Sequence, residues 1–224
     1  MIILVTGGAG YIGSHCCRAL KKAGFVPVVF DNFENGYREN VRWGESFEGD
    51  IRRIEDLQAA FSRFQPDAVI HFAAYAYVGE SVKKPEKYYK NNLQGSLNLL
   101  EVMREFQVRK LIFSSSCATY GIPDRVPIVE TQPQLPVNPY GNTKLIMEMM
   151  MRDYAAAGHI DFAALRYFNA AGAASDAEIG ENHVPETHLI PLVFDAASGR
   201  RPNVTVFGDN YPTEDGTCIR DYIH

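Results

Sequence analysis

The sequence has few cysteines, and no two of them stand at metal-binding or redox spacing. Cys16, Cys17, Cys117 and Cys218 are the only four among 224 residues, and none belongs to a C-x-x-C motif. A disulfide framework of the kind that holds small secreted domains together is therefore not expected. Four thiols without such a framework are typical of a reducing compartment, so we expect a cytoplasmic protein.

Long apolar runs and an excess of positive charge are also missing. No apolar stretch approaches the roughly 20 residues of a membrane-spanning helix, and the opening MIILVTGG lacks the positive flank of a signal peptide. The chain has 22 Lys and Arg against 27 Asp and Glu, which gives a net charge of -5. This balance gives no electrostatic reason to expect nucleic acid or an acidic membrane as a partner.

The sequence does contain apolar, strand-like runs that alternate with segments of helical periodicity. The expected strands are residues 2–6, 26–31, 46–50, 68–73, 110–116 and 162–168. Expected helices begin near residue 12, span residues 54–64 and 85–105, and begin again at Pro139. A repeated strand-helix-strand order predicts an α/β fold, namely a Rossmann-type doubly wound parallel sheet with helices on both faces.

The composition changes after about residue 170, where Pro, Gly, Asn, Asp and His become frequent. A helix is expected at residues 189–198 and a strand at residues 204–207. We therefore expect a dinucleotide-binding domain at residues 1–170. Residues 171–224 are expected to form the beginning of a smaller substrate-binding region that is incomplete in this chain.

A glycine-rich turn follows the first expected strand and opens the first helix. Gly7, Gly10 and Gly13 have G-x-x-G-x-x-G spacing, and Asp31 closes the second strand eighteen positions after Gly13. Glycines are needed where the turn is tight and where the backbone approaches a pyrophosphate, which then meets the N–H groups of the helix N-terminus. An acidic residue at the end of the second strand accepts ribose hydroxyls and repels a 2′-phosphate. The unit therefore predicts NAD binding.

Tyr140 and Lys144 stand four positions apart in NPYGNTK, at the start of an expected helix. Asn138 suits the N-cap and Pro139 the first helical position, because proline lacks the N–H that has no partner there. Residues at i and i+4 share a helix face, so the phenol and the ammonium group point the same way. A lysine beside a tyrosine favours the phenolate, which can act as a base.

The motifs VTGGAGYIGSH, VGESVKKPEKYYKNN, FSSSCATYG, RYFNAAGA and YPTEDGTCIRDYIH occur in this order. Together they resemble the extended short-chain dehydrogenase/reductase family, and within it the nucleotide-sugar epimerases. The resemblance covers essentially the whole chain. It implies an isomerase of galactose metabolism that uses NAD to interconvert UDP-glucose and UDP-galactose through a 4-keto intermediate.

The resemblance also assigns roles to individual residues. It makes Tyr140 the base, Lys144 its partner and Ser116 the third catalytic residue, whereas spacing alone cannot choose among Ser114, Ser115 and Ser116. The residues that it implies for NAD are Gly7, Gly10, Tyr11, Ile12, Gly13, Asp31, Asn32, Asp50, Ile51, Phe72, Ala73, Ala74, Asn91, Lys144 and Phe168. For the nucleotide sugar it implies Ser116, Tyr140, Asn169, His188, Leu189, Phe207 and Arg220. No metal is expected, and His71 is expected to be a core histidine.

Two departures from the family pattern stand out. Many relatives carry a lysine near the NAD pyrophosphate where this sequence has Ala76. Family members also continue well past His224, so we expect a C-terminally truncated epimerase that has little activity at this length. The complete protein is expected to be a homodimer.

Several alternatives stay open. A related epimerase acting on UDP-glucuronate or UDP-N-acetyl sugars is one, because the residues that gauge the sugar are expected beyond His224. A nucleotide-sugar dehydratase or decarboxylase is a second, although Cys117 and Ala118 stand where a dehydratase has an Asp-Glu pair. An NAD-binding protein without catalysis is a third, and the intact Ser116, Tyr140, Lys144 set argues against it. A metal site at His183 and His188 is disfavoured, because their spacing is wrong for a helical zinc pair.

Overall fold

The computed structural model describes residues 1–224. Contacts within the chain divide it into two units, Met1–Tyr167 and Phe168–His224, and each unit is described by itself. No helix in either unit is both long and apolar enough to span a membrane. The functional roles expected for residues 1–170 and 171–224 stay predictions.

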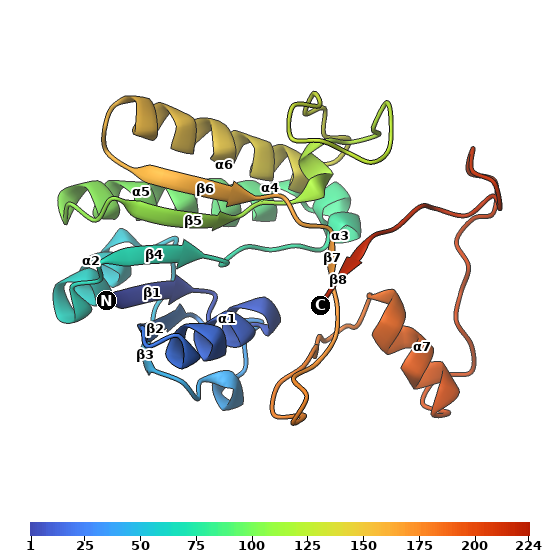
Figure 1. Cartoon of the computed structure of the whole chain (residues 1–224), viewed down its shortest axis with the longest axis horizontal. Coiled ribbons are helices and arrows are strands. Elements are labelled where there is room, and N and C mark those ends of the chain that lie inside the picture. The colour runs from blue at the N-terminus through green and yellow to red at the C-terminus, as the bar shows by residue number, and fades with distance from the viewer. The chain divides into compact units, whose positions relative to one another are not determined.

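The first unit is built on a six-stranded sheet whose neighbouring strands are all parallel. Its strands are β1 (Ile2–Thr6), β2 (Val26–Asp31), β3 (Glu45–Glu48), β4 (Ala68–His71), β5 (Lys110–Ser114) and β6 (Asp161–Leu165). They lie side by side in the order β3-β2-β1-β4-β5-β6, with Val5 in register with Val29 and with Ile70 (Figure 1). The order reverses between β1 and β4, which is the arrangement of a doubly wound sheet. The predicted Rossmann-type fold is confirmed.

Alternating strand residues face two separate layers of core. Leu4 packs with residues of α2 (Ile54–Phe64), α5 (Gly95–Glu105) and α6 (Pro139–Ala156) on one face of the sheet. Its neighbours Ile3 and Val5 pack on the other face, against residues of α1 (Tyr11–Lys22). Because successive strand residues point to opposite faces, a strand covered on both sides has to be apolar throughout. This explains why IILVT is a continuous apolar run.

Several predicted strands end earlier than expected. β4 ends at His71, β5 at Ser114 and β6 at Leu165, and the residues that follow leave the sheet as loops at its carboxyl edge. The segment predicted as one helix at residues 85–105 is helical throughout but consists of α4 (Pro85–Tyr88), a π-helical turn (Tyr89–Gln94) and α5. The short helix α3 (Val78–Lys83), which precedes α4, was not predicted. Neither were the 3-10 turns Arg38–Asn40 and Cys117–Thr119.

His71 is a core histidine, as predicted. It is 1% exposed, and its two ring nitrogens lie 2.6 Å from Thr6 Oγ1 and 2.9 Å from Ser96 Oγ. Burial lowers its pKa to about 3, so the ring is neutral at physiological pH. Both ring nitrogens are used to join β4 to β1 and α5, which accounts for a histidine in an apolar strand.

The second unit contains β7 (Asn169–Ala170), β8 (Tyr222–Ile223) and α7 (Leu189–Ala197). β7 and β8 pair in parallel. The helix expected at residues 189–198 is present, but the strand expected at residues 204–207 is wrong. Phe207 is 96% exposed and no strand pairs with this segment, so its apolar alternation has neither a core nor a ladder to join.

Candidate active site

The glycine-rich turn joins β1 to α1 and has no room for larger side chains. Gly7 has a φ of +72°, and a Cβ there would lie 2.7 Å from the backbone nitrogen of Ala73. A Cβ on Gly13 would lie 2.2 Å from the carbonyl oxygen of Gly7. Glycine is therefore required at both positions, so that the helix can pack directly against the turn.

The N-terminus of α1 is suited to an anion. Gly10 is the N-cap residue, no side chain caps the helix, and its first turn has no acidic residue. N–H groups at a helix start attract phosphate oxygens, and the helix dipole adds to this attraction. The predicted residues Tyr11 and Ile12 lie in this first turn, so the element fits the pyrophosphate of a dinucleotide.

Asp31 ends β2 beside the glycine-rich turn. Its Oδ2 accepts a hydrogen bond from the Ala9 backbone N–H at 3.0 Å, and its Oδ1 accepts one from that of Phe33 at 2.9 Å. Burial raises the pKa of Asp31, although these two hydrogen bonds oppose the shift. Each carboxylate oxygen has a second lone pair, so the fixed side chain can also accept hydroxyl groups. The predicted ribose-binding role is compatible with this geometry.

Asp50 follows β3, and its carboxylate is held by neighbouring side chains. Arg52 donates from Nε to Oδ1 and Oδ2 at 2.9 and 3.0 Å, and Asn32 donates from Nδ2 to Oδ2 at 3.2 Å. Partial burial raises the pKa of Asp50, but the hydrogen bonds from Arg52 outweigh it and hold the pKa at about 2. Asn32 and Asp50, which were both predicted to contact NAD, therefore lie in contact with each other. Arg52, which was not predicted, bonds to the same carboxylate.

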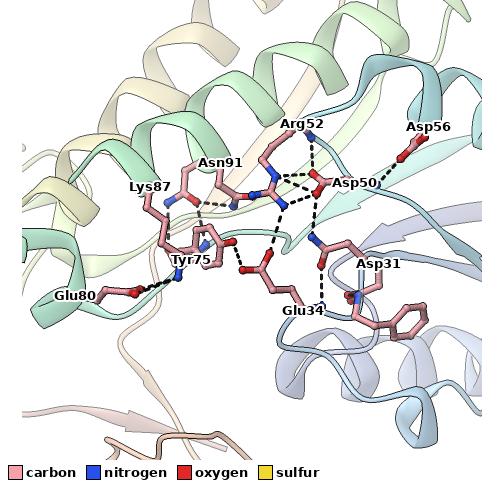
Figure 2. Close-up of polar contacts among 12 residues, drawn as sticks. Asp31, Glu34, Asp50, Arg52, Asp56, Tyr75, Glu80, Lys87 and Asn91 are labelled. Carbon is pink, nitrogen blue, oxygen red and sulfur yellow. Dashed lines mark hydrogen bonds and ion pairs between the residues drawn. The ribbon is translucent and has the colours of Figure 1, made fainter. Parts of the chain in front are cut away.

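The same arginine continues a chain of polar contacts along the carboxyl edge of the sheet. Figure 2 shows Arg52 pointing also toward Glu34, whose carboxylate accepts at 3.3 Å from Arg52 and at 2.5 Å from the Tyr75 hydroxyl. Burial first, and then Glu34, raises the pKa of Tyr75, so the phenol stays protonated and donates. Sequence reasoning missed these three residues, because the side chains that meet come from loops 18 and 41 positions apart.

The loop after β4 carries Phe72, Ala73 and Ala74, which are all partly exposed. Asn92 fixes this loop: its Oδ1 accepts from the Tyr75 backbone N–H at 2.9 Å and its Nδ2 donates to the Tyr75 carbonyl at 3.1 Å. The predicted residue Asn91 is 7% exposed and donates to Asn92 Oδ1 at 3.1 Å. Both asparagines lie in the π-helical turn, a distortion that is frequent at functional sites. Because Asn91 and Asn92 are adjacent and identical, the sequence alone could not show that Asn92 is the one that bonds to the loop.

The predicted cofactor residue Ile51 is fixed by packing. Ile51 is 4% exposed, and a Cβ on Gly95 would lie 2.5 Å from its Cδ1. The carbonyl oxygen of Ile51 accepts from Asn98 Nδ2 at 3.0 Å. Phe168 is the first residue of the second unit and is partly exposed.

Helix α6 begins as its sequence predicts. Asn138 is the N-cap, and its Oδ1 accepts from the Gly141 backbone N–H at 2.8 Å, with Pro139 in the first helical position. One helical turn separates Tyr140 from Lys144, and the Lys144 Nζ lies 5.8 Å from the centroid of the Tyr140 ring. Lys144 is 2% exposed and donates to the Ser114 carbonyl oxygen at 2.8 Å.

Burial affects both members of this pair. It raises the pKa of Tyr140 to about 12, although a hydrogen bond with the Ser116 side chain opposes the shift. It lowers the pKa of Lys144 to about 7, so the ammonium group is only partly populated at neutral pH. The expected lowering of the Tyr140 pKa by Lys144 together with a bound nicotinamide stays a prediction. For each group, burial disfavours the charged form and is the largest cause of its pKa shift.

The three serines at the end of β5 have separate partners. The Ser114 hydroxyl contacts the Tyr167 hydroxyl closely, and Ser115 donates to Glu148 Oε1 at 2.5 Å. Ser116 instead makes the hydrogen bond with Tyr140, and its Oγ accepts from the Ala118 backbone N–H at 3.1 Å. Of the three serines, Ser116 alone therefore interacts with the Tyr140 side chain. Spacing alone could not have made this choice.

In the second unit, three of the residues predicted for the nucleotide sugar lie together. Asn169 in β7, His188 at the N-cap of α7 and Leu189 in its first turn line one small pocket. Phe207 is 96% exposed, and Arg220 is also exposed and donates to Cys218 Sγ at 3.4 Å. These two residues do not line the pocket with the other three.

Comparison with known proteins gives a consistent result along the whole chain. The model of the NAD dependent epimerase/dehydratase family matches residues 3–224. A UDP-glucose 4-epimerase of Rhizobium leguminosarum bv. trifolii is 54% identical over 222 residues, which are 99% of this chain and 68% of that protein. One from Lacticaseibacillus casei is 50% identical, over 100% of this chain and 68% of that protein.

Solved structures are equally similar. A UDP-glucose 4-epimerase from Brucella ovis, in complex with NAD, shares 55% identity and a TM-score of 0.96 over 100% of this chain and 69% of its own. One from Bifidobacterium longum, in complex with NAD+ and UDP, shares 40% identity and a TM-score of 0.95 over 100% of this chain and 70% of its own.

Proposed function

Because the chain belongs to the NAD dependent epimerase/dehydratase family, we propose that it is an NAD-dependent isomerase that interconverts UDP-glucose and UDP-galactose. The relatives of similar sequence are UDP-glucose 4-epimerases, and similar solved structures contain NAD or NAD+ with UDP. The reaction inverts the configuration at C4 of the sugar through a 4-keto intermediate.

One observation carries the proposal beyond family membership: Ser116 and Tyr140 share a hydrogen bond beside buried Lys144. A phenol and a hydroxyl that interact with each other can hold one substrate oxygen between them. Both lie where the strands of the sheet end, the edge at which open α/β sheets bind ligands. The site therefore supports proton transfer at a hydroxyl group of a bound ligand.

The residues of the first unit fit a dinucleotide. The glycines at positions 7 and 13 allow the backbone to approach a pyrophosphate, and the start of α1 has neither a cap nor an acidic residue. Asp31 is fixed with lone pairs available for ribose hydroxyls. When bound, NAD accepts and returns the hydride at C4 of the sugar, and its positive charge favours a phenolate.

Tyr140 takes the proton of the sugar 4-hydroxyl as C4 is oxidised, and it gives the proton back when C4 is reduced. Ser116 holds the same oxygen and lowers the pKa of Tyr140, opposing the effect of burial. Lys144, fixed to the Ser114 carbonyl, supplies a charge one helical turn from the phenol when it is protonated. With its pKa near 7, Lys144 can change protonation state within the physiological range.

The nucleotide sugar is proposed to use Asn169, His188 and Leu189, which line one pocket in the second unit. Phe207 and Arg220 are proposed on the family resemblance alone. Assembly as a homodimer also rests on that resemblance, and location in the cytoplasm rests on four free cysteines.

A nucleotide-sugar dehydratase is the second candidate, and the site argues against it. Elimination needs an acid and a base beside the catalytic serine, but Cys117 and Ala118 occupy those positions in the 3-10 turn after Ser116. The carboxylate of Glu148 is bonded to this serine segment. It accepts hydrogen bonds from Ser115 and from Arg166. The Glu148 carboxylate is therefore not free to serve as the acid or base of an elimination.

The test of this function is to supply UDP-galactose with NAD and to follow UDP-glucose by a coupled dehydrogenase assay. Formation of UDP-glucose is expected from a protein of the relatives' full length, of which this chain spans 68%, and little product is expected from the 224 residues alone. Formation of a 4-keto-6-deoxy sugar would favour the dehydratase, and NAD binding without any sugar product would favour the noncatalytic alternative. UDP-N-acetylgalactosamine and UDP-galacturonate should be supplied in parallel, because the alternative sugars differ at C2 and C6.

We expect NAD to bind at least about tenfold more tightly than NADP, because a 2′-phosphate would face the buried Asp31 carboxylate. Asp31→Asn should narrow this ratio by removing the negative charge. Quenching of intrinsic fluorescence measures both affinities. Glu55→Gln, which neutralises an exposed acid on α2, is the control and should leave the ratio unchanged. Equal affinities of the unaltered protein for the two cofactors would overturn the role of Asp31.

A further inference from the structure

Four side chains with metal-binding atoms gather in the loop that precedes α7. Their closest ligand atoms, from Glu181, His183, Glu186 and His188, all lie within 4.8 Å of one another. Sequence spacing argued against a metal at His183 and His188 because no helical pair and no further ligand were evident. The structure supplies the two further ligands from glutamates of the same loop.

Two of the four distances within this cluster match those around a small divalent cation, and the two made by His188 are shorter. His188 Nδ1 lies 2.8 Å from Glu181 Oε1 and 3.1 Å from Glu186 Oε1. His183 Nδ1 lies 3.5 Å from Glu181 Oε1 and 3.6 Å from Glu186 Oε2. A tetrahedral zinc ion with bonds of about 2.0–2.2 Å separates its ligand atoms by about 3.3–3.6 Å. The His183 distances fall in this range, whereas the His188 distances would have to lengthen by a few tenths of an ångström on coordination.

Burial and charge in the cluster also favour a cation. The side chain of Glu181 is 7% exposed and that of Glu186 is 14% exposed, and their ion-pair partners are these two histidines. Two carboxylates withdrawn from water carry two negative charges, which cost free energy unless cations compensate them.

Glu186 is also oriented by the backbone. Its Oε1 accepts from the backbone N–H groups of Thr187 at 2.7 Å and of His188 at 2.8 Å. Metal-binding carboxylates are commonly fixed in this way by hydrogen bonds to the oxygen that does not bind the metal. Oε2 of Glu186 faces His183, so it is the oxygen available for coordination.

We propose that Glu181, His183, Glu186 and His188 bind one divalent cation of the zinc class. Four protein ligands without an open position are typical of a structural site. The cation would fix the loop of residues 181–188 in front of α7. His188 uses Nδ1 toward the carboxylates, which leaves its Nε2 for another contact. This proposal does not depend on the proposed epimerase activity.

The test is a titration of the 224-residue chain with Zn²⁺ after treatment with a chelator, in competition with a chromogenic chelator. We expect one equivalent of zinc to bind and to raise the thermal unfolding temperature, because a ligand of the folded state stabilises it. The double variant Glu181→Gln/Glu186→Gln should bind zinc at least about tenfold more weakly. His183→Asn should weaken it likewise, and circular dichroism establishes that each variant is folded.

The matched control is Glu178→Gln/Glu214→Gln, which makes the same charge change at two exposed residues of the same unit. Cys218→Ser controls for zinc bound by the exposed thiol. Both controls should bind zinc as the unaltered chain does. No stoichiometric zinc, or equal binding by the cluster variants and the controls, would overturn the proposal. The cluster would then be an ion-paired group held by a protonated His188.

Discussion

Tyr140→Phe is expected to lower kcat for epimerisation by about 10³-fold while leaving NAD bound. Positioned acid-base groups contribute roughly 10²–10⁴-fold to rate, and a phenyl ring has no proton to exchange with the sugar hydroxyl. The substitution keeps the ring that packs beside Lys144 and removes only the oxygen bonded to Ser116. Turnover is measured with UDP-galactose in a form of the protein that is active on it. NAD affinity is measured separately by fluorescence.

Tyr154→Phe is the matched control, because Tyr154 lies on the same helix and its hydroxyl bonds to Glu101, away from the serine segment. The control should retain turnover and NAD affinity. A Tyr140→Phe protein with near-normal kcat would refute Tyr140 as the acid-base group. Loss of NAD binding together with activity would mean that Tyr140 holds the cofactor site together instead.

Arg166→Met is expected to destabilise the protein by about 3 kcal/mol, because it leaves a buried carboxylate without its main counter-ion. The Glu148 side chain is 2% exposed, and Arg166 donates to its Oε1 at 2.9 Å from Nε and to its Oε2 at 2.7 Å from NH2. Ser115 and Gln134 bond to the same carboxylate but carry no charge. Urea unfolding followed by circular dichroism measures the free energy of unfolding.

Arg109→Met provides the comparison, since Arg109 pairs with Asp161 at the opposite end of β6. The side chains of this pair are 54% and 70% exposed, so its loss should cost below about 1 kcal/mol. Equal losses for the two variants would show that the buried Glu148 pair does not contribute as proposed.

The Glu148 pair also predicts a dependence on pH. Burial raises the pKa of Glu148, but the hydrogen bonds from Arg166, Ser115 and Gln134 outweigh it and lower the pKa below its ordinary value of 4.5. The contribution of the pair to stability is therefore complete above about pH 4.5 and is lost as the pH falls through the lower folded-state pKa. The difference in stability between the unaltered protein and Arg166→Met should shrink over that range. A constant difference would contradict this assignment.

The sequence by itself determined the local elements on which the dinucleotide site depends. β1, β2 and α2 have the bounds that periodicity predicted. The glycine-rich turn lies between a strand and a helix, and Tyr140 and Lys144 share the start of one helix. Each of these features depends on residues only a few positions apart, where strand alternation, helix capping and glycine geometry operate.

Tertiary structure decided which of these residues meet. It gave Ser114, Ser115 and Ser116 different partners, among which Ser116 alone interacts with Tyr140. It brought Arg52 and Tyr75, from two separate loops, into hydrogen bonds with Glu34 in a third. These loops come together because of the order of the strands in the sheet. No other strand pairs with residues 204–207, so this segment does not form a β-strand although its sequence is strand-like. Pairing and burial depend on neighbours tens of positions away, and burial, more than sequence spacing, sets the protonation of Tyr140 and Lys144.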